Sequence, residues 1–452
     1  MKKNWKHYIG YGIGALGMDL SYGLFYSFLS IYLTDILLLS PAFLAVMTFA
    51  ARIWDGINDP MMGAIVDGTR SRFGKYRRWI VTGALCNGFV LAMLFRKPAL
   101  SGAGLMAYVA VAYVLWGMTN TMMDIPYWSM VPSLTNDPKE RNIAATIPRF
   151  FSGMGQFAIT ILSPILIPLL GHTEKGLFSA AGFFRWAILC AAALVGLIFV
   201  TFFSTGKIRA IAGAAPSQNK ITAKSVLDTL RRNDQLLVFM LVSLLTNTGW
   251  YLVSGLAVYY FQKVLGNGLL MSLFGMLVGG GQGVGLLLLP VLTKWMKRNS
   301  VIKLAMGVSA AGYLGMYVFS AVWNVFPLFV AFGFLGMMGV GCVFVSQTVM
   351  LSDIVDYGEY KLGRRSDSVV FSMKGFLQKG AYSIQSLIMY LGLAVTGYNG
   401  AAQTQPAAAR AGISVMMFLL PPVLTLAGLF LFSAKYKLDE KRMREVQIAV
   451  GR

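Results

Sequence analysis

The chain has 452 residues, of which 56% are hydrophobic and only 13% are charged, and its mean hydropathy is +0.64. Soluble domains carry about 25% charged residues, so this composition excludes a soluble globular protein and indicates a polytopic membrane protein. The net charge of +21 does not indicate a nucleic-acid-binding protein, because the basic residues lie in short loops between apolar segments and act there as topology signals.

Windows of about twenty apolar residues predict twelve membrane spans. The first half of the chain contains spans at 9–36, 42–66, 79–97, 104–133, 145–170 and 180–204. The second half contains spans at 237–262, 268–293, 301–320, 326–353, 370–396 and 411–434. We therefore expect an all-α membrane protein with two pseudo-symmetric six-helix bundles, at 1–204 and 237–434, joined by a central loop at 205–236 and followed by a tail at 435–452.

Basic residues cluster on alternate connections between these spans. They follow spans two, four, eight and ten and also fill the central loop, as at Arg70, Arg72, Lys75, Arg77, Arg78, Lys139, Arg141, Lys207, Arg209, Lys294, Lys297, Arg298, Lys361, Arg364 and Arg365. By the positive-inside rule, both termini and the central loop lie in the cytoplasm, and an even number of spans agrees with this. The lipid bilayer is thus the expected surroundings. The sequence does not define an oligomeric state, and a monomer is the default expectation.

The sequence lacks the motifs of an enzyme or a cofactor protein. Cys86, Cys190 and Cys342 lie singly inside apolar spans, which argues against a disulfide framework or a metal cluster. The stretch GMLVGGGQGVG at 275–285 has no strand before it and no Lys-Ser/Thr after it, so it predicts close helix packing or flexing rather than a phosphate loop. No nucleophile elbow or dinucleotide fingerprint has its required setting, and we expect no enzymatic activity and no cofactor.

The second span carries acids where a membrane helix tolerates them least. Asp55 and Asp59 lie about 40° apart around a helix, with Asn58 beside them. Such residues face the protein interior and mark an ion or substrate path, and their oxygens suit Na⁺, while a proton could titrate the same acids. Pro60 is expected to turn Asp59 away from regular helix and to free carbonyl oxygens. A structural salt bridge from Arg52 is the alternative for Asp55.

Further polar residues lie inside other spans, namely Asp19, Thr121, Asp124, Trp128, Arg149, Lys374 and Lys379. The acids and bases could cancel as structural salt bridges, since removing one partner of a buried pair is costly. A bridge alone needs no aromatic ring, yet Trp128 lies one turn from Asp124 on the same helix face. An aromatic plane covers the apolar face of a pyranose while charged groups bind its hydroxyls, so we predict a sugar-type substrate.

Several long motifs carry a resemblance to a known family. RIWDGINDPMMG with SRFGKYRRW, MDIPYWSMVPSLTNDPKER with PRFF, and DIVDYGEYKLGRR resemble the glycoside–pentoside–hexuronide:cation symporters of the major facilitator superfamily, and within them the melibiose permease branch. The resemblance spans nearly the whole chain. It implies the major facilitator fold, a multi-pass protein of the bacterial cytoplasmic (inner) membrane, and import of a glycoside such as melibiose or a related galactoside by alternating access.

The resemblance also implies roles for individual residues. It places the coupling cation, Na⁺ with H⁺ or Li⁺ as substitutes, between spans two and four at Asp55, Asn58, Asp59 and Thr121. It places the sugar at Asp19, Asp124, Trp128, Arg149 and Lys379. In this reading the two acids accept hydrogen bonds from sugar hydroxyls, the tryptophan stacks on the ring, and the arginine donates to hydroxyls or holds a carboxylate.

The chain departs from that branch at positions around the expected sugar site. It has Met18 in place of a lysine, Asn120 in place of a tyrosine, Phe344 in place of a tryptophan, and Lys374–Gly375 in place of a glutamine–threonine pair. Asn120, Phe344 and Lys374 remain candidate sugar-binding residues. Lys374 favours an anionic sugar such as a hexuronide or only balances Asp19, so the sugar is left open. A lysolipid transporter of the same fold is a weaker alternative, because it would be favoured by apolar residues at Asp19, Asp124 and Arg149, and all three are polar here.

Overall fold

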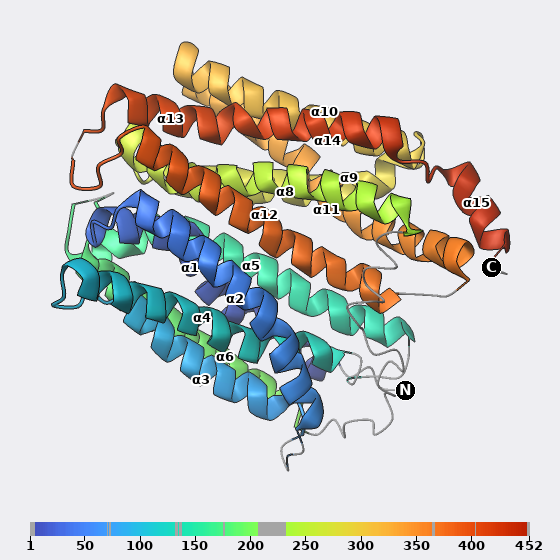
Figure 1. The fold of residues 1–452 in the computed structure, drawn as a ribbon, viewed down its shortest axis with the longest axis horizontal. Coiled ribbons are helices and arrows are strands. Elements are labelled where there is room, and N and C mark those ends of the chain that lie inside the picture. The colour runs from blue at the N-terminus through green and yellow to red at the C-terminus, as the bar shows by residue number, and fades with distance from the viewer. Residues whose placement is uncertain are drawn as a thin grey trace. The chain divides into compact units, whose positions relative to one another are not determined.

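The computed structural model describes residues 5–69, 71, 74–131, 134, 138–174, 177–206, 232–363, 367–402 and 404–449. Within these ranges the regular elements are helices, and a helix lies at each of the twelve predicted spans (Figure 1). Eight of the described helices are long and apolar enough to cross a membrane. Outside the described residues lie most of the central loop (207–231) and the predicted topology signals Arg70, Arg72, Arg364 and Arg365.

The helices of the first half are α1 (Trp5–Ile31), α2 (Pro41–Gly68), α3 (Arg77–Leu94), α4 (Gly102–Met130), α5 (Pro138–Gly171) and α6 (Ala180–Ser204). A π-helical turn, η1 (Tyr32–Ile36), continues α1. Ser40 caps α2 by accepting a hydrogen bond from the Phe43 N–H at 3.3 Å, and Pro41 follows where its missing N–H costs nothing. Ser179 caps α6 in the same way through Gly182. These caps fix where spans two and six begin.

The helices of the second half are α8 (Asp234–Tyr259), α9 (Leu270–Leu292), α10 (Arg298–Tyr317), α11 (Phe326–Leu362), α12 (Asp367–Val395), α13 (Ala407–Phe418) and α14 (Leu420–Lys435). The π-helical turns η3 (Tyr260–Val264) and η4 (Val318–Val322) continue α8 and α10. The last predicted span, 411–434, is divided into α13 and α14 at Leu419. Pro421 and Pro422 lack the N–H groups that a continuous helix would need and are tolerated in the first turn of a new one.

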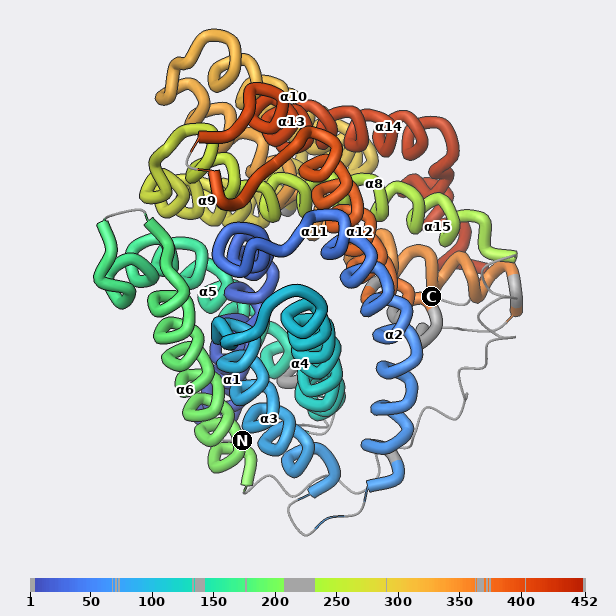
Figure 2. The backbone as a smooth tube through the Cα atoms, turned by 60° about the vertical axis from the view of Figure 1, so that its left-hand side comes forward, coloured from blue at the N-terminus to red at the C-terminus, as the bar shows by residue number. Residues whose placement is uncertain are grey.

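Contacts divide the chain into two compact units. Unit 1 contains Met1–Pro216, Phe261–Ser272 and Tyr398–Gln405, and unit 2 contains Ser217–Tyr260, Leu273–Gly397 and Pro406–Arg452. In unit 1, α1 packs against α5 and α6, and α3 packs against α4 and α6 (Figure 2). Contacts also join α2 to α4. In unit 2, α8 packs against α12 and α14, and α10 packs against α11 and α14.

A reciprocal tyrosine pair fixes α1 against α4 inside unit 1. The Tyr11 hydroxyl donates to the Tyr127 carbonyl at 2.5 Å, and the Tyr127 hydroxyl donates to the Tyr11 carbonyl at 2.6 Å. The two rings stack with their centroids 4.5 Å apart. Aromatic area is thus buried without an unsatisfied hydroxyl. Because Tyr127 precedes Trp128, the pair also fixes the part of α4 that carries candidate sugar-binding residues.

One face of α2 is apolar and exposed. It consists of side chains that recur every four residues and are between 48% and 59% exposed, namely Phe49, Ile53, Ile57, Met61 and Ile65. This spacing follows one side of a helix, and such a stripe suits contact with lipid. Asn58, on another face, is only 8% exposed. The polar residues of α2 therefore lie on the side of the helix that faces the rest of unit 1.

The close approach of α9 and α11 in unit 2 depends on glycine. A Cβ added at Gly281 would lie 2.6 Å from the Phe334 carbonyl oxygen, and one at Gly285 would overlap the Met338 carbonyl. Gly283, between them, has no such neighbour within 4 Å. Close helix packing, the first of the two uses predicted for the stretch GMLVGGGQGVG, is confirmed at these two positions.

The C-terminal residues pack onto unit 2. The helix α15 (Glu440–Ala449) buries Met443 and Val446, and its Glu440 carboxylate accepts a hydrogen bond from the Arg298 N–H at 2.6 Å. The segment after α14 is therefore a docked helix as far as residue 449.

Candidate functional site

The candidate cation residues lie where α2 packs against α4. The Thr121 hydroxyl on α4 donates to the Asp59 carboxylate on α2 at 2.9 Å. Thr121 is 4% exposed and Asn58 is 8% exposed, so the polar face of α2 is turned into unit 1. The structure thus brings Asp59 and Thr121 together from positions 62 residues apart in the chain.

Asp55 has a cationic partner on its own helix. The Arg52 guanidinium and the Asp55 carboxylate are 2.8 Å apart, and both side chains are largely buried. Arg52 also lies over the Tyr26 ring, at 5.9 Å from its centroid. The salt bridge from Arg52, the alternative considered for Asp55, is therefore present, and it occupies one of the two carboxylate oxygens. The other oxygen points towards α4, where a Cβ added at Gly117 would lie 3.0 Å from it.

Pro60 does not interrupt the helix. Residues Pro41 to Gly68 form one continuous α2 with Pro60 inside it, so the prediction that Asp59 leaves regular helix is wrong. Pro60 nevertheless has no N–H for the carbonyl of Gly56 four residues before it, so that oxygen loses its helical donor.

The donor set on α2 and α4 fits a small hard cation. It consists of two carboxylates, one amide and one hydroxyl, and oxygens of these kinds suit alkali ions better than soft metals. The buried Nδ2 of Asn58 has no hydrogen-bond partner among the described residues. Because amide oxygen and nitrogen are assigned from their hydrogen bonds, a flipped Asn58 presents an oxygen there instead. In the described part of the chain, no group of three or more His, Cys, Asp or Glu side chains could hold a metal ion.

The candidate sugar residues of unit 1 converge on Asp124. The Tyr22 hydroxyl from α1 and the Trp128 indole N–H from α4 both donate to the same Asp124 oxygen at 3.0 Å. The Arg149 guanidinium from α5 lies over the Trp128 ring, at 5.0 Å from its centroid. Three helices therefore meet here: α4 supplies the carboxylate and the aromatic plane, α5 the cation and α1 the tyrosine hydroxyl.

Asp19 and Asn120 also belong to unit 1. Asp19 lies where α1 crosses α5, and a Cβ added at Gly155 would lie 3.0 Å from the Asp19 Cβ. The Asn120 Oδ1 on α4 is buried and has no hydrogen-bond partner among the described residues. Met18, which replaces a lysine of the melibiose permease branch, is 1% exposed and packs in the apolar core of unit 1.

The sequence reasoning missed the aromatic residues that support these acids. Tyr22 bonds to Asp124 directly, and the Trp116 ring meets Tyr22 and Tyr26 edge to face at 6.1 and 5.9 Å. Tyr22 lies three residues after Asp19, on the same helix face, and this spacing was the available signal.

The other candidate sugar residues lie in unit 2. Phe344 on α11 meets Trp250 on α8 edge to face, with centroids 6.4 Å apart. Lys379 is half-buried on α12. Lys374 also lies on α12, but its side chain is outside the described residues.

Comparison with known proteins identifies the family. A family model described as MFS/sugar transport protein matches residues 10–440. The chain belongs to this family. It is 28% identical to the putative glycoside/cation symporter YagG of Escherichia coli (strain K12), over 98% of this chain and 94% of that protein. It is 29% identical to the isoprimeverose transporter of Lactiplantibacillus pentosus, over 87% of this chain and 81% of that protein.

Membership in the MFS/sugar transport family agrees with the shape of the backbone. A crystal structure of a mutant of the nucleoside transporter NupG superposes with a TM-score of 0.68 at 13% identity, over 95% of this chain and 100% of that one. This likeness shows the fold alone. The predicted kinship with the glycoside–pentoside–hexuronide:cation symporters and the all-helical major facilitator fold are confirmed. The chain is a membrane-bound sugar symporter and not an enzyme.

Proposed function

We propose that this symporter imports a glycoside, melibiose or a related galactoside, together with Na⁺, and that H⁺ or Li⁺ can replace the Na⁺. The observation that carries the proposal is the Thr121–Asp59 hydrogen bond, which joins α2 and α4 next to Asp55 and Asn58. These four residues supply oxygen donors of the kind that Na⁺ binds. The relative described as a putative glycoside/cation symporter supports coupling to a cation.

The proposed coupling is electrostatic. Asp55 and Asp59 are like charges one turn apart in the low-dielectric interior, and Arg52 offsets the first of them. A bound cation adds a positive charge beside the two carboxylates and lets α2 and α4 close around it. The group around Asp124, which follows Thr121 on α4, then binds the sugar more tightly. By linkage, the sugar raises the affinity for the cation by the same factor.

Sugar recognition follows from the group around Asp124. Asp124 and Asp19 accept hydrogen bonds from sugar hydroxyls, Trp128 covers the apolar face of the ring, and Tyr22 holds Asp124 in place. Before a pyranose can stack on the face of Trp128 that Arg149 covers, the guanidinium has to move aside. It can then donate to the sugar hydroxyls. Asn120 of unit 1, and Phe344, Lys374 and Lys379 of unit 2, remain proposed sugar-binding residues.

The proposed topology has twelve spans in two six-helix bundles and both termini in the cytoplasm of a bacterial cell, in the inner membrane. The helices at the twelve predicted ranges support the span count, because each lies where an apolar window occurs. Transport then proceeds by alternating access of the site to the two sides of the membrane.

A hexuronide is the second candidate substrate. In the described part of the chain the Arg149 guanidinium contacts the Trp128 ring and no carboxylate, so it is able to take an acidic sugar as its partner. A lysolipid substrate is disfavoured, since two acids and an arginine line this part of unit 1.

Uptake of labelled sugars tests the proposal. Cells that express the protein would be given galactosides, glucosides, xylosides and glucuronides, each with and without Na⁺. We expect a galactoside to accumulate and Na⁺ to stimulate its uptake. Preference for a glucuronide would favour the second candidate. Uptake of every sugar without dependence on Na⁺ or pH would rule out symport.

A further inference from the structure

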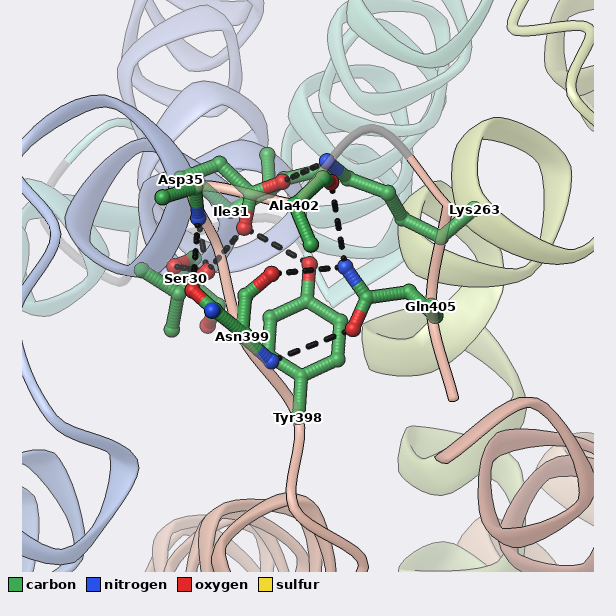
Figure 3. A network of polar contacts seen from close by, with 10 residues as sticks. Ser30, Ile31, Asp35, Lys263, Tyr398, Asn399, Ala402 and Gln405 are labelled. Atoms are coloured by element: carbon green, nitrogen blue, oxygen red, sulfur yellow. Dashed lines mark hydrogen bonds and ion pairs between the residues drawn. The ribbon is translucent and has the colours of Figure 1, made fainter. Parts of the chain in front are cut away.

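The end of α1 is joined to two segments from the second half of the chain. Phe261–Ser272 and Tyr398–Gln405 belong to unit 1 by their contacts, although the residues on either side of each segment belong to unit 2. Both segments meet η1, the π-helical turn after α1 (Figure 3). The polar contacts at η1 therefore lie within unit 1, although the two segments come from the second half of the chain.

Asp35 in η1 is the centre of these contacts. Its Oδ2 lies 2.7 Å from the Lys263 Nζ, and its Oδ1 accepts a hydrogen bond from the Tyr398 hydroxyl at 2.7 Å. The Thr34 hydroxyl donates to the same Oδ1 at 2.7 Å. The side chains of Lys263 and Asp35 are only 15% and 9% exposed. One carboxylate thus holds both segments through separate oxygens.

The segment that carries Tyr398 is pre-shaped for this contact. The Gln405 amide donates to the Asn399 carbonyl at 2.6 Å and accepts from the Asn399 N–H at 3.1 Å, which closes the loop on itself. Gly400 then lies directly on η1, because an added Cβ would overlap the Thr34 carbonyl and lie 3.0 Å from the Asp35 Cα. Only a residue without a side chain fits at this position.

The ion pair joins equivalent places in the two halves. Asp35 lies in η1, which ends the first span of the first half, and Lys263 lies in η3, which ends the first span of the second half. π-Helical turns are rare and are frequently found at functional sites. Here two of them carry opposite charges and meet.

A cavity keeps one side of the ion pair close to water. It has a volume of about 140 Å³, and Asp35 and Lys263 both line it, together with Gln262 and Gly400. Its walls are mixed, with apolar residues such as Ile31, Phe178 and Phe183 on one part and Asp35, Lys263 and Gln262 on the other. A space of this size with polar groups on part of its wall can hold water beside the two charges. Hydration lowers the cost of separating two charges, whereas a dry buried pair is very costly to break. The cavity therefore favours a contact that opens and closes over a permanent salt bridge.

We propose that Asp35, Lys263 and Tyr398 form a releasable clasp. It holds the two segments against η1 and so closes the cavity at the extracellular end of α1 to the outside. The clasp rests on the proposed topology, which places residue 36 outside the cell, and on alternating access. While it is formed, the two segments stay on η1. When it opens, they leave η1 and expose the cavity side of α1 to the outside.

Thiol labelling tests the clasp without any need for sugar or cation. Ile31 lines the cavity and is 1% exposed, so Ile31→Cys reports opening when Cys86, Cys190 and Cys342 are replaced by serine. A membrane-impermeant maleimide is added to intact cells. Loss of a charged hydrogen bond shifts such an equilibrium by about tenfold or more, so Asp35→Asn and Lys263→Met should speed labelling by that factor.

Two further variants separate opening from misfolding. Gly400→Ala forces the loop off η1 and should also speed labelling, while Thr404→Ala, an exposed position in the same loop, should not. Tyr398→Phe keeps the ring and both charges, so it should fold and give a smaller increase. Unchanged labelling in Asp35→Asn and Tyr398→Phe, or equal labelling in Thr404→Ala, would overturn the clasp. If the clasp variants are labelled faster but sugar uptake does not depend on Na⁺, the proposed function is overturned and the clasp is not.

Discussion

Asp55 and Asp59 lie one helical turn apart on α2, but their partners differ. Arg52, on the same helix, gives Asp55 an ion pair, while Thr121, on α4, gives Asp59 a hydrogen bond from a neutral hydroxyl. A hydroxyl can rotate and offer its oxygen to a cation, whereas a guanidinium cannot accept. At the scale of single residues, the Thr121 contact of Asp59 is therefore easier to exchange for Na⁺ than the Arg52 contact of Asp55.

Substitution of Asp59 by asparagine tests this difference. Asp59→Asn keeps the size of the side chain and removes the charge, so we expect sugar binding to persist while Na⁺-driven accumulation is lost. Thr121→Ala removes the hydroxyl oxygen that would bind the cation and should weaken Na⁺ binding by roughly tenfold, an effect of the size found for one polar contact to a charged group. Both can be measured by uptake and by Na⁺ titration of purified protein.

The matched control is Thr48→Ala. The Thr48 hydroxyl is also buried on α2, but it donates only to the carbonyls of its own helix, at Leu44 and Ala45. It should leave Na⁺ binding unchanged. Normal concentration of sugar by Asp59→Asn would remove Asp59 from the cation site.

Periodicity predicted part of this site and could not predict the rest. The angle between Asp55 and Asp59 and the possible Arg52 bridge follow from helix geometry within one span. The partnership of Asp59 with Thr121 is a contact between helices, and only the family resemblance suggested it. Tyr22 was missed, because a tyrosine in an apolar span has the same pattern whether it packs against lipid or bonds to a buried acid.

At the scale of elements, apolar windows located the helices well and their interruptions poorly. Pro60 was expected to disturb α2, yet the helix continues through it. Pro421 and Pro422, by contrast, divide the last span into α13 and α14. The two sequence signals differ, because Pro60 stands alone, whereas Pro421 and Pro422 are adjacent and remove the N–H groups of two successive residues. A single missing N–H leaves α2 continuous, and the pair coincides with the start of a new helix. The apolar pattern of the sequence does not mark the π-helical turns η1, η3 and η4.

The glycines of α9 give a prediction at this scale. Gly281→Ala brings a Cβ to 2.6 Å from the Phe334 carbonyl, so α9 and α11 must separate. We expect a loss of about 1–3 kcal/mol in the free energy of unfolding, as for other overpacked cores. Thermal unfolding in detergent, followed by tryptophan fluorescence, measures the change.

Gly283→Ala is the control within the same motif. An added Cβ at Gly283 meets nothing within 4 Å, and alanine is the better helix former by about 1 kcal/mol, so this variant should be as stable as the wild type or more stable. Equal destabilisation by both substitutions would show that the motif acts through flexibility rather than through packing.

At the scale of the whole molecule, two compact units carry different parts of the proposed machinery. Unit 1 contains the candidate cation residues, the group around Asp124 and the clasp at Asp35, while Phe344, Lys374 and Lys379 belong to unit 2. Alternating access requires the two units to move as separate bodies. In the proposed mechanism the cation acts within unit 1, and its effect on transport passes through sugar binding.

Isothermal titration of the purified protein with melibiose, in Na⁺ and in choline, tests the coupling between the two ligands directly. A coupling free energy of about 1–3 kcal/mol predicts binding that is roughly 5 to 150 times tighter in Na⁺, and titration with Na⁺ in the presence of melibiose should show the same factor. Equal melibiose affinity in the two salts, at every pH tested, would contradict cation coupling through Asp59 and Thr121.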